Sequence, residues 1–84
     1  VHVLLFKGDL PDEKWERQSD HAQRTLYGET IDLGGKITAE HGIGILRKSY
    51  LSMNLGSSEL DAIKRLKSAL DPKYILNPGK IFDL

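Results

Sequence analysis

The chain has 84 residues, carries twelve basic and twelve acidic side chains, and contains no cysteine. Its zero net charge gives no electrostatic basis for binding nucleic acid or an anionic membrane, and no apolar run approaches the ~20 residues that a membrane span needs. The absence of cysteine excludes disulfides, thiolate catalysis and zinc–thiolate sites, and it is compatible with the reducing cytoplasm, where we expect the protein.

The chain opens with a predicted strand followed by a predicted helix. Val1 to Phe6 is a continuous apolar run rich in β-branched residues, which is typical of a strand covered on both faces. Apolar residues then recur along one stripe from Pro11 to Leu33, and this spacing predicts a helix. Asp9 is the candidate cap of this helix, and Gly34 to Gly35 ends it.

A second strand is predicted over Lys36 to Ala39, where apolar and polar residues alternate. A helix between two strands of one sheet is the βαβ pattern. The spacing over Gly42 to Met53 predicts a short irregular helix, and a further helix begins after the capping residues Ser57 and Ser58. Pro72 ends that helix. We therefore predict an α+β fold with two to three helices packed on a small sheet.

The eleven residues from Gly34 to Gly44 contain four glycines and place Glu40 directly before His41. Glycines at this density predict a sharply bent backbone that a ligand can approach closely. An imidazole is the side chain best suited to move a proton near neutral pH, so the pair indicates catalysis. The structural alternative is a strand end with a solvated Glu40 and a His41 that hydrogen-bonds a backbone carbonyl.

The order of motifs resembles the C-terminal part of the FAD-linked oxidases of the vanillyl-alcohol oxidase type, in particular the glycolate oxidase flavoprotein subunit and D-lactate dehydrogenase. The resemblance is carried by the run from Gly35 to Gly44, by Lys48, by Leu70 to Pro72 and by Ile75 to Lys80. It implies a ferredoxin-like C-terminal domain on the substrate side of the enzyme. It also implies that the FAD-binding domain lies outside residues 1–84, and we interpret the chain as an excised C-terminal piece that is inactive alone.

The same resemblance implies roles for individual residues. His41 would be the base that takes the hydroxyl proton of a small 2-hydroxy acid, glycolate or D-lactate, while FAD receives the hydride. Glu40 and His2, with a histidine further upstream, would bind a divalent metal such as zinc. Asn77 and Lys80 of the terminal turn would contact the cofactor region, although this turn could equally serve only to fix the C-terminus. A structural role for His2 is likewise open.

The resemblance also implies a substrate contact that this chain lacks: some related hydroxy-acid dehydrogenases carry Asn two residues after the strand histidine, and here that position is Leu4. This difference favours the glycolate and D-lactate branch. Arg47 and Lys48 could bind a substrate carboxylate, but solvated side chains are the favoured interpretation. We expect an electron-accepting partner subunit and self-association through exposed apolar surface. The alternative function is a small ferredoxin-like binding or assembly module without an active site.

Overall fold

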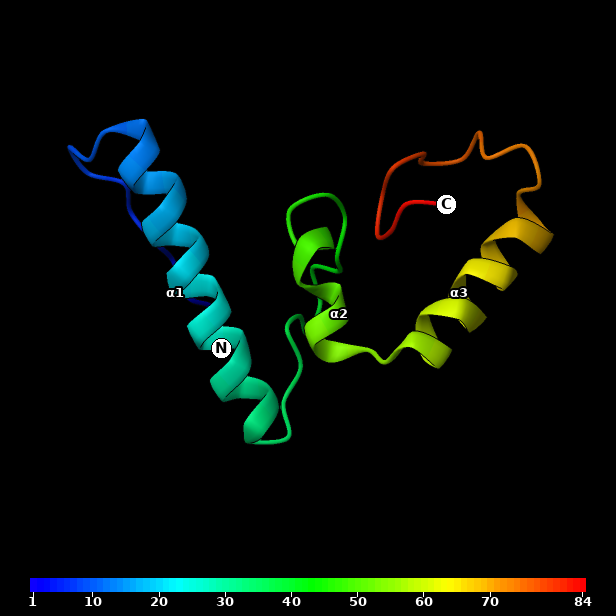
Figure 1. Cartoon of the computed structure of the whole chain (residues 1–84), viewed down its shortest axis with the longest axis horizontal. Helices are drawn as coiled ribbons and strands as arrows, with labels where there is room; N and C mark the ends of the chain where they lie inside the picture. The colour runs from blue at the N-terminus through cyan, green and yellow to red at the C-terminus, as the bar shows by residue number, and fades with distance from the viewer.

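The computed structural model describes all 84 residues, and it contains helices but no β-strand. Helix α1 spans Asp12–Asp32, the 3₁₀ helix η1 spans Lys48–Tyr50, α2 spans Leu51–Asn54 and α3 spans Ser57–Leu70. The helices are spread in an open arrangement with α2 in the middle, and the C-terminal segment turns back from the end of α3 toward α2 (Figure 1). None of these helices is both long enough and apolar enough to cross a membrane.

The molecule is extended and has little interior. Its radius of gyration is 15.0 Å and its extents are 45 × 29 × 20 Å, whereas a compact domain of this length has a radius of gyration of roughly 12 Å. Four residues are buried, each with 5% of its surface exposed: Ile37, Tyr50, Leu51 and Asp71. Because so little apolar surface is removed from water, turns and specific side-chain bonds must define much of the local geometry.

The predicted α+β fold is wrong, because neither of the expected strands forms. Residues 1–6 and 36–39 have no strand assignment, and no backbone hydrogen bond joins them. The backbone N–H of Ile37 instead bonds the side-chain Oδ1 of Asn54 in α2, at 3.1 Å. An apolar, β-branched run becomes a strand only when another strand satisfies its backbone groups, and nothing in this chain does so for Val1 to Phe6.

The predicted first helix is confirmed, with its ends one residue inside the expected range. The N-terminal cap is Pro11, and no side chain caps the helix, so the expected cap at Asp9 is wrong. At the other end Gly34 has a φ of +84°. The N–H of Gly35 bonds the carbonyl of Thr30 at 2.8 Å and that of Gly34 bonds the carbonyl of Ile31 at 2.9 Å. These two bonds form a Schellman motif, which ends α1 as the glycine pair predicts.

The later helices also follow the expected order, but their capping differs. The irregular helix predicted over Gly42 to Met53 takes the form of η1 and α2, and α3 ends at Leu70, before Pro72. Gly56 is the cap of α3, without a side-chain bond, so the expected capping by Ser57 and Ser58 is wrong. A cap requires the serine side chain outside the helix, and here that serine is already its first residue.

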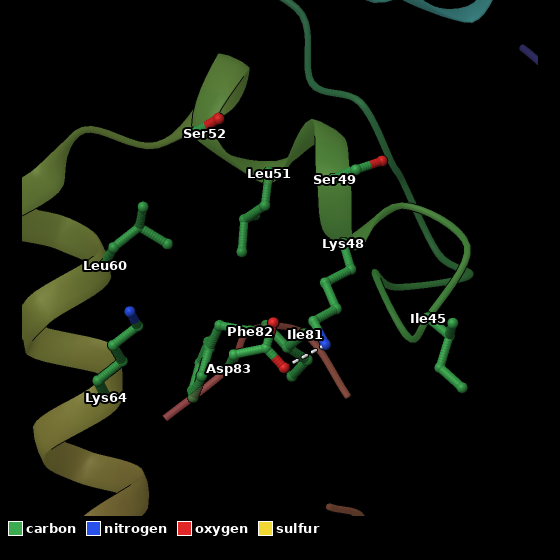
Figure 2. A pocket seen from close by; sticks show the side chains of 10 residues that line it. All are labelled: Ile45, Lys48, Ser49, Leu51, Ser52, Leu60, Lys64, Ile81, Phe82 and Asp83. Carbon is green, nitrogen blue, oxygen red and sulfur yellow. Dashed lines mark hydrogen bonds and ion pairs between the residues drawn. The ribbon is translucent and has the colours of Figure 1, made fainter. Parts of the chain in front are cut away.

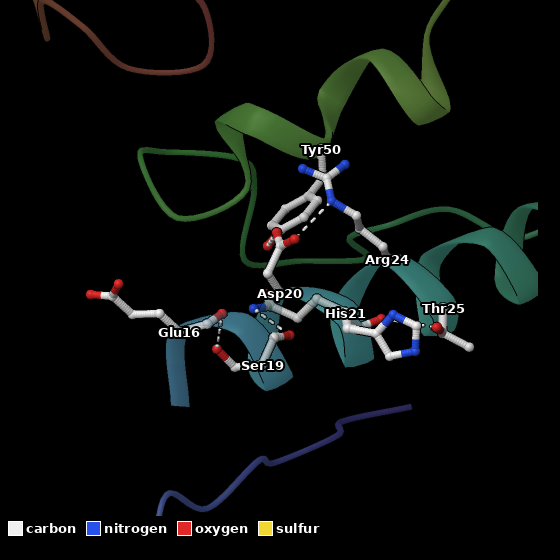
Figure 3. Close-up of polar contacts among 8 residues, drawn as sticks. Glu16, Ser19, Asp20, His21, Arg24, Thr25 and Tyr50 are labelled. Carbon is white, nitrogen blue, oxygen red and sulfur yellow. Dashed lines mark hydrogen bonds and ion pairs between the residues drawn. The ribbon is translucent and has the colours of Figure 1, made fainter. Parts of the chain in front are cut away.

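A polar contact joins α1 to the middle of the chain (Figure 3). The phenol of Tyr50 donates a hydrogen bond to Oδ1 of Asp20 at 2.7 Å, and Nε of Arg24 donates to Oδ2 at 3.0 Å. The Arg24 guanidinium also lies 5.0 Å from the centre of the Tyr50 ring, and Tyr27 meets the same ring edge-on. These contacts hold η1 against α1 at the end of the loop that follows His41.

Candidate functional site

The structure brings His2, Glu40 and His41 together, although they come from segments almost forty residues apart. Nε2 of His2 lies 3.0 Å from Oε1 of Glu40, and Nε2 of His41 lies 3.8 Å from the same oxygen. The two imidazole rings meet edge-on, with 5.3 Å between their centres. One carboxylate therefore stands between two imidazoles, with one candidate ligand atom from each residue within 4.8 Å of the others.

The three side chains are open to solvent, with exposed fractions of 69% for His2, 67% for Glu40 and 61% for His41. Exposure keeps the carboxylate and both rings accessible to a small ligand. Neither histidine side chain makes a hydrogen bond that would fix its ring within the chain. Its orientation therefore depends on the backbone that carries it and on whatever occupies the site.

The backbone around Glu40 and His41 is held by side chains and not by a strand. Gly42 has a φ of +76°, a conformation that glycine adopts at little cost. Its N–H donates to Oγ1 of Thr38 at 3.0 Å, and its carbonyl accepts from Nη1 of Arg47 at 3.3 Å. Hydrogen bonds to the side chains of Thr38 and Arg47 thus stabilise the turn at Gly42.

The donor set fits a divalent metal. Two imidazole nitrogens and one carboxylate oxygen with an open position are a usual catalytic zinc set, and ligands of one zinc ion lie roughly 3–4 Å apart. The separations of 3.0 and 3.8 Å from Glu40 fall in that range. His41 is close enough to join the set, but a nitrogen that coordinates a metal cannot also accept a proton. The metal-binding role of His2 and Glu40 stays a prediction.

Asn77 and Lys80 lie in the terminal turn, away from the histidine cluster in sequence but linked to its loop. The N–H of Lys80 bonds the carbonyl of Asn77 at 3.4 Å and Gly79 has a φ of +74°, as the predicted type II turn requires. The turn lines a hollow of about 380 Å³. Neither the Asn77 nor the Lys80 side chain makes a hydrogen bond or ion pair within the chain, so their cofactor role stays a prediction.

Lys48, expected to be solvated, connects this terminal segment to the loop after His41. Its ammonium lies 2.5 Å from Oδ1 of Asp83 and 3.2 Å from the carbonyl of Gly79. Figure 2 shows Lys48 reaching Asp83 at a hollow of about 470 Å³. A backbone bond of 2.8 Å from Ile81 to the carbonyl of Gly44 joins the same two segments. Because Asp83 neutralises Lys48, this lysine is not free to bind a substrate carboxylate.

Sequence reasoning missed the structural role of the Asp71 carboxylate, which fixes the segment leading to the terminal turn. Its oxygens accept hydrogen bonds from the N–H groups of Ile75 at 3.2 Å and Leu76 at 3.0 Å, and Lys67 lies 2.5 Å away. The Lys67 ammonium, followed by these backbone donors, lowers the pKa of Asp71 although its burial opposes the shift. Asp followed by Pro after a helix was the available signal, and it indicated only the helix end.

The family comparison decides what kind of domain carries this cluster. Residues 1–81 match the model of the FAD linked oxidases, C-terminal domain. The chain belongs to this family. The glycolate oxidase subunit GlcD of Bacillus subtilis is 42% identical over 88% of the chain. The D-lactate dehydrogenase of Anaerostipes hadrus is 32% identical over 96% of the chain, and the D-2-hydroxyglutarate dehydrogenase of Xanthomonas citri pv. viticola is 47% identical over 99%.

These relatives are much longer than the chain, which spans only 16 to 18% of their length. Their names cover three different 2-hydroxy acids, so the relatives share the family and differ in the acid that their names give. No solved structure matches the chain. The resemblance read from the sequence motifs is therefore confirmed at the level of the family.

Proposed function

We propose that residues 1–84 form the C-terminal, substrate-side portion of a longer FAD-dependent enzyme that oxidises a small 2-hydroxy acid to the 2-oxo acid. The observation that carries the proposal is the meeting of His2, Glu40 and His41 in one exposed cluster within a member of the FAD-linked oxidase family. The FAD-binding domain would lie elsewhere in the longer protein, with Asn77 and Lys80 near the cofactor region.

His41 is the proposed catalytic base. Oxidation of a 2-hydroxy acid removes a proton from the hydroxyl and a hydride from the adjacent carbon, and the carbon–oxygen bond becomes a carbonyl. FAD, when bound, supplies the acceptor for that hydride. Nε2 of His41 takes the hydroxyl proton, because an imidazole nitrogen can act as a general base and its side chain is 61% exposed to an incoming substrate.

Glu40 and His2 are the proposed ligands of a divalent metal, with zinc as the candidate that suits one carboxylate and imidazole donors. A metal held there would polarise the substrate hydroxyl and favour its deprotonation. Assigning the metal to His2 and Glu40 leaves the lone pair of His41 available for the proton. Without metal, Oε1 of Glu40 still stands 3.8 Å from Nε2 of His41.

The proposed substrate is glycolate or D-lactate. Val1, Val3 and Leu5 line one hollow with residues of α1, and His2 and Leu4 alternate with them along the segment. Leu4 is 76% exposed and offers an apolar side chain two residues after His2. An apolar side chain cannot bond the second carboxylate of a longer diacid, which would lose its hydration without compensation.

The family match of residues 1–81 supports the enzyme over the rival function, a ferredoxin-like binding module without an active site. The absence of a sheet does not separate the two, because both were expected to have a ferredoxin-like fold. A cytoplasmic location and an electron-accepting partner subunit stay predictions. So does self-association, which the exposed apolar segment Val1 to Phe6 would favour.

The test is anaerobic stopped-flow reduction of the flavin by glycolate or D-lactate in the full-length flavoprotein. His41→Ala should leave FAD bound and slow reduction by ~10²–10⁴-fold, the usual contribution of a positioned base. His21→Ala is the matched control, since His21 is exposed on α1 outside the cluster. If His41→Ala reduces flavin as fast as the His21→Ala control, the proposed role of His41 is wrong.

A further inference from the structure

Gly42 follows His41 directly, and the His41 imidazole makes no hydrogen bond of its own within the chain. Two side chains take both backbone polar groups of this glycine. The hydroxyl oxygen of Thr38 accepts from its N–H at 3.0 Å, and the guanidinium of Arg47 donates to its carbonyl at 3.3 Å. Because the chain has no strands, no inter-strand hydrogen bonds hold the backbone at Gly42, and the bonds to Thr38 and Arg47 satisfy its polar groups instead.

Arg47 has no acidic partner, unlike the neighbouring Lys48. Lys48 is paired with Asp83, whereas Arg47 makes no ion pair in the chain and its Nε is buried without a hydrogen-bond partner. Its own N–H bonds the carbonyl of Ile43 at 3.1 Å, so the arginine is fixed within the turn it supports. The Arg47 guanidinium therefore bonds the neutral backbone carbonyl of Gly42 and takes part in no surface ion pair.

We propose that Thr38 and Arg47 are positioning residues that hold Gly42 and thereby set the direction of the His41 imidazole for proton transfer. This inference rests on the proposed function of His41. Loss of either side chain would let water take over its bond to Gly42, because this glycine is exposed. The fold would persist while the turn sampled other orientations. A misplacement of about 1 Å at a reacting group can cost about 10²-fold in rate.

The experiment compares substitutions in the full-length flavoprotein by anaerobic flavin reduction, recording the limiting rate and the substrate concentration at half-maximal rate. Thr38→Val removes the accepting oxygen with almost no change of shape, and Thr38→Ser restores it. Arg47→Met removes the donor, and Arg47→Lys restores a charged donor. We expect the valine and methionine variants to lower the limiting rate by about 10–100-fold, with half-saturation changed by less than about 3-fold.

The conservative variants separate positioning from general stability. Thr38→Ser and Arg47→Lys should recover most of the rate, and the Val–Met double variant should fall less than the product of the single effects, because both act on one glycine. Matched controls are Thr25→Val and Arg65→Met, which remove the same groups from the exposed surface of α1 and α3. They should leave the rate unchanged.

Two results would overturn the inference. One is a wild-type limiting rate in both Thr38→Val and Arg47→Met. The other is a loss that the conservative variants do not restore, or that accompanies loss of FAD or a lowered melting temperature, since that pattern belongs to a folding defect. If the unmodified flavoprotein itself fails to reduce its flavin with any 2-hydroxy acid, the proposed function fails first.

Discussion

Two glycines, one inside α1 and one just after it, should respond with opposite sign to substitution by alanine. Gly28 lies inside the helix, and a Cβ added there would meet nothing within 4 Å. Gly34 lies just beyond the helix with a φ of +84°, also with open space around it. Neither alanine would clash with a neighbour, so the two substitutions differ only in backbone conformation.

The magnitude follows from this comparison. Replacing glycine by alanine restricts the unfolded chain equally at both positions, which stabilises the fold by about 0.4–1 kcal/mol. At Gly28 nothing opposes this gain, so Gly28→Ala should raise the free energy of unfolding by about 0.5–1 kcal/mol. At Gly34 the left-handed conformation costs alanine about 1–2 kcal/mol, so Gly34→Ala should lower it by about 0.5–1 kcal/mol.

Urea unfolding of the chain, followed by circular dichroism at the helix band, measures the difference. With a slope of about 1 kcal/mol per molar urea, typical of a small chain, the two midpoints should be separated by roughly 1–2 M on opposite sides of the unmodified chain. Equal midpoints, or stabilisation by Gly34→Ala, would show that α1 does not end in the Schellman motif described above.

Two further predictions concern the metal and the contact between α1 and η1. Metal analysis of the full-length flavoprotein should show that His2→Ala and Glu40→Gln lose a bound divalent ion while His41→Ala retains it; loss in His41→Ala instead would make His41 a ligand. The hydrogen bond from Tyr50, followed by that from Arg24, lowers the pKa of Asp20 in the folded chain. This contact therefore stabilises the fold fully above the pKa of an unfolded carboxyl group. The stabilisation is lost as the pH falls through the lower pKa that Asp20 has in the folded chain. Tyr50→Phe should therefore weaken the dependence of stability on pH below about pH 4 in urea titrations, and an unchanged acid dependence would contradict this reasoning.

The sequence was informative where structure depends on neighbouring residues and uninformative where it depends on distant ones. Pro11 and the glycine pair located both ends of α1 within one residue, because helix ends are decided by backbone conformation in a few consecutive residues. The apolar run at Val1 to Phe6 led to a wrong strand prediction. A strand forms only when it pairs with another strand, and the local composition does not show whether such a partner is present.

The candidate site divides in the same way. Adjacent Glu40 and His41 were visible as a motif in the chain, and the family resemblance added His2, which the structure places 3.0 Å from Glu40. The contact of Tyr50 with Asp20 spans 30 residues, and nothing in either local pattern indicates it. Asp71 was hidden for another reason: its carboxylate binds backbone N–H groups, which every residue but proline offers.

An exposed cluster in an open chain can still have a defined geometry when short-range bonds close each turn around it. Thr38, Gly42 and Arg47 lie within ten residues, so fastening this turn requires no large core and little loop-closure entropy. His2 is different, because it comes from a segment without backbone bonds to its neighbour and approaches Glu40 through side chains alone. The proposed base is therefore positioned by its own loop, whereas the proposed metal pair depends on how the N-terminal segment is held. The position of His41 should consequently tolerate changes near Val1 that abolish metal binding, and such changes should slow catalysis only by removing the polarisation that the metal would supply.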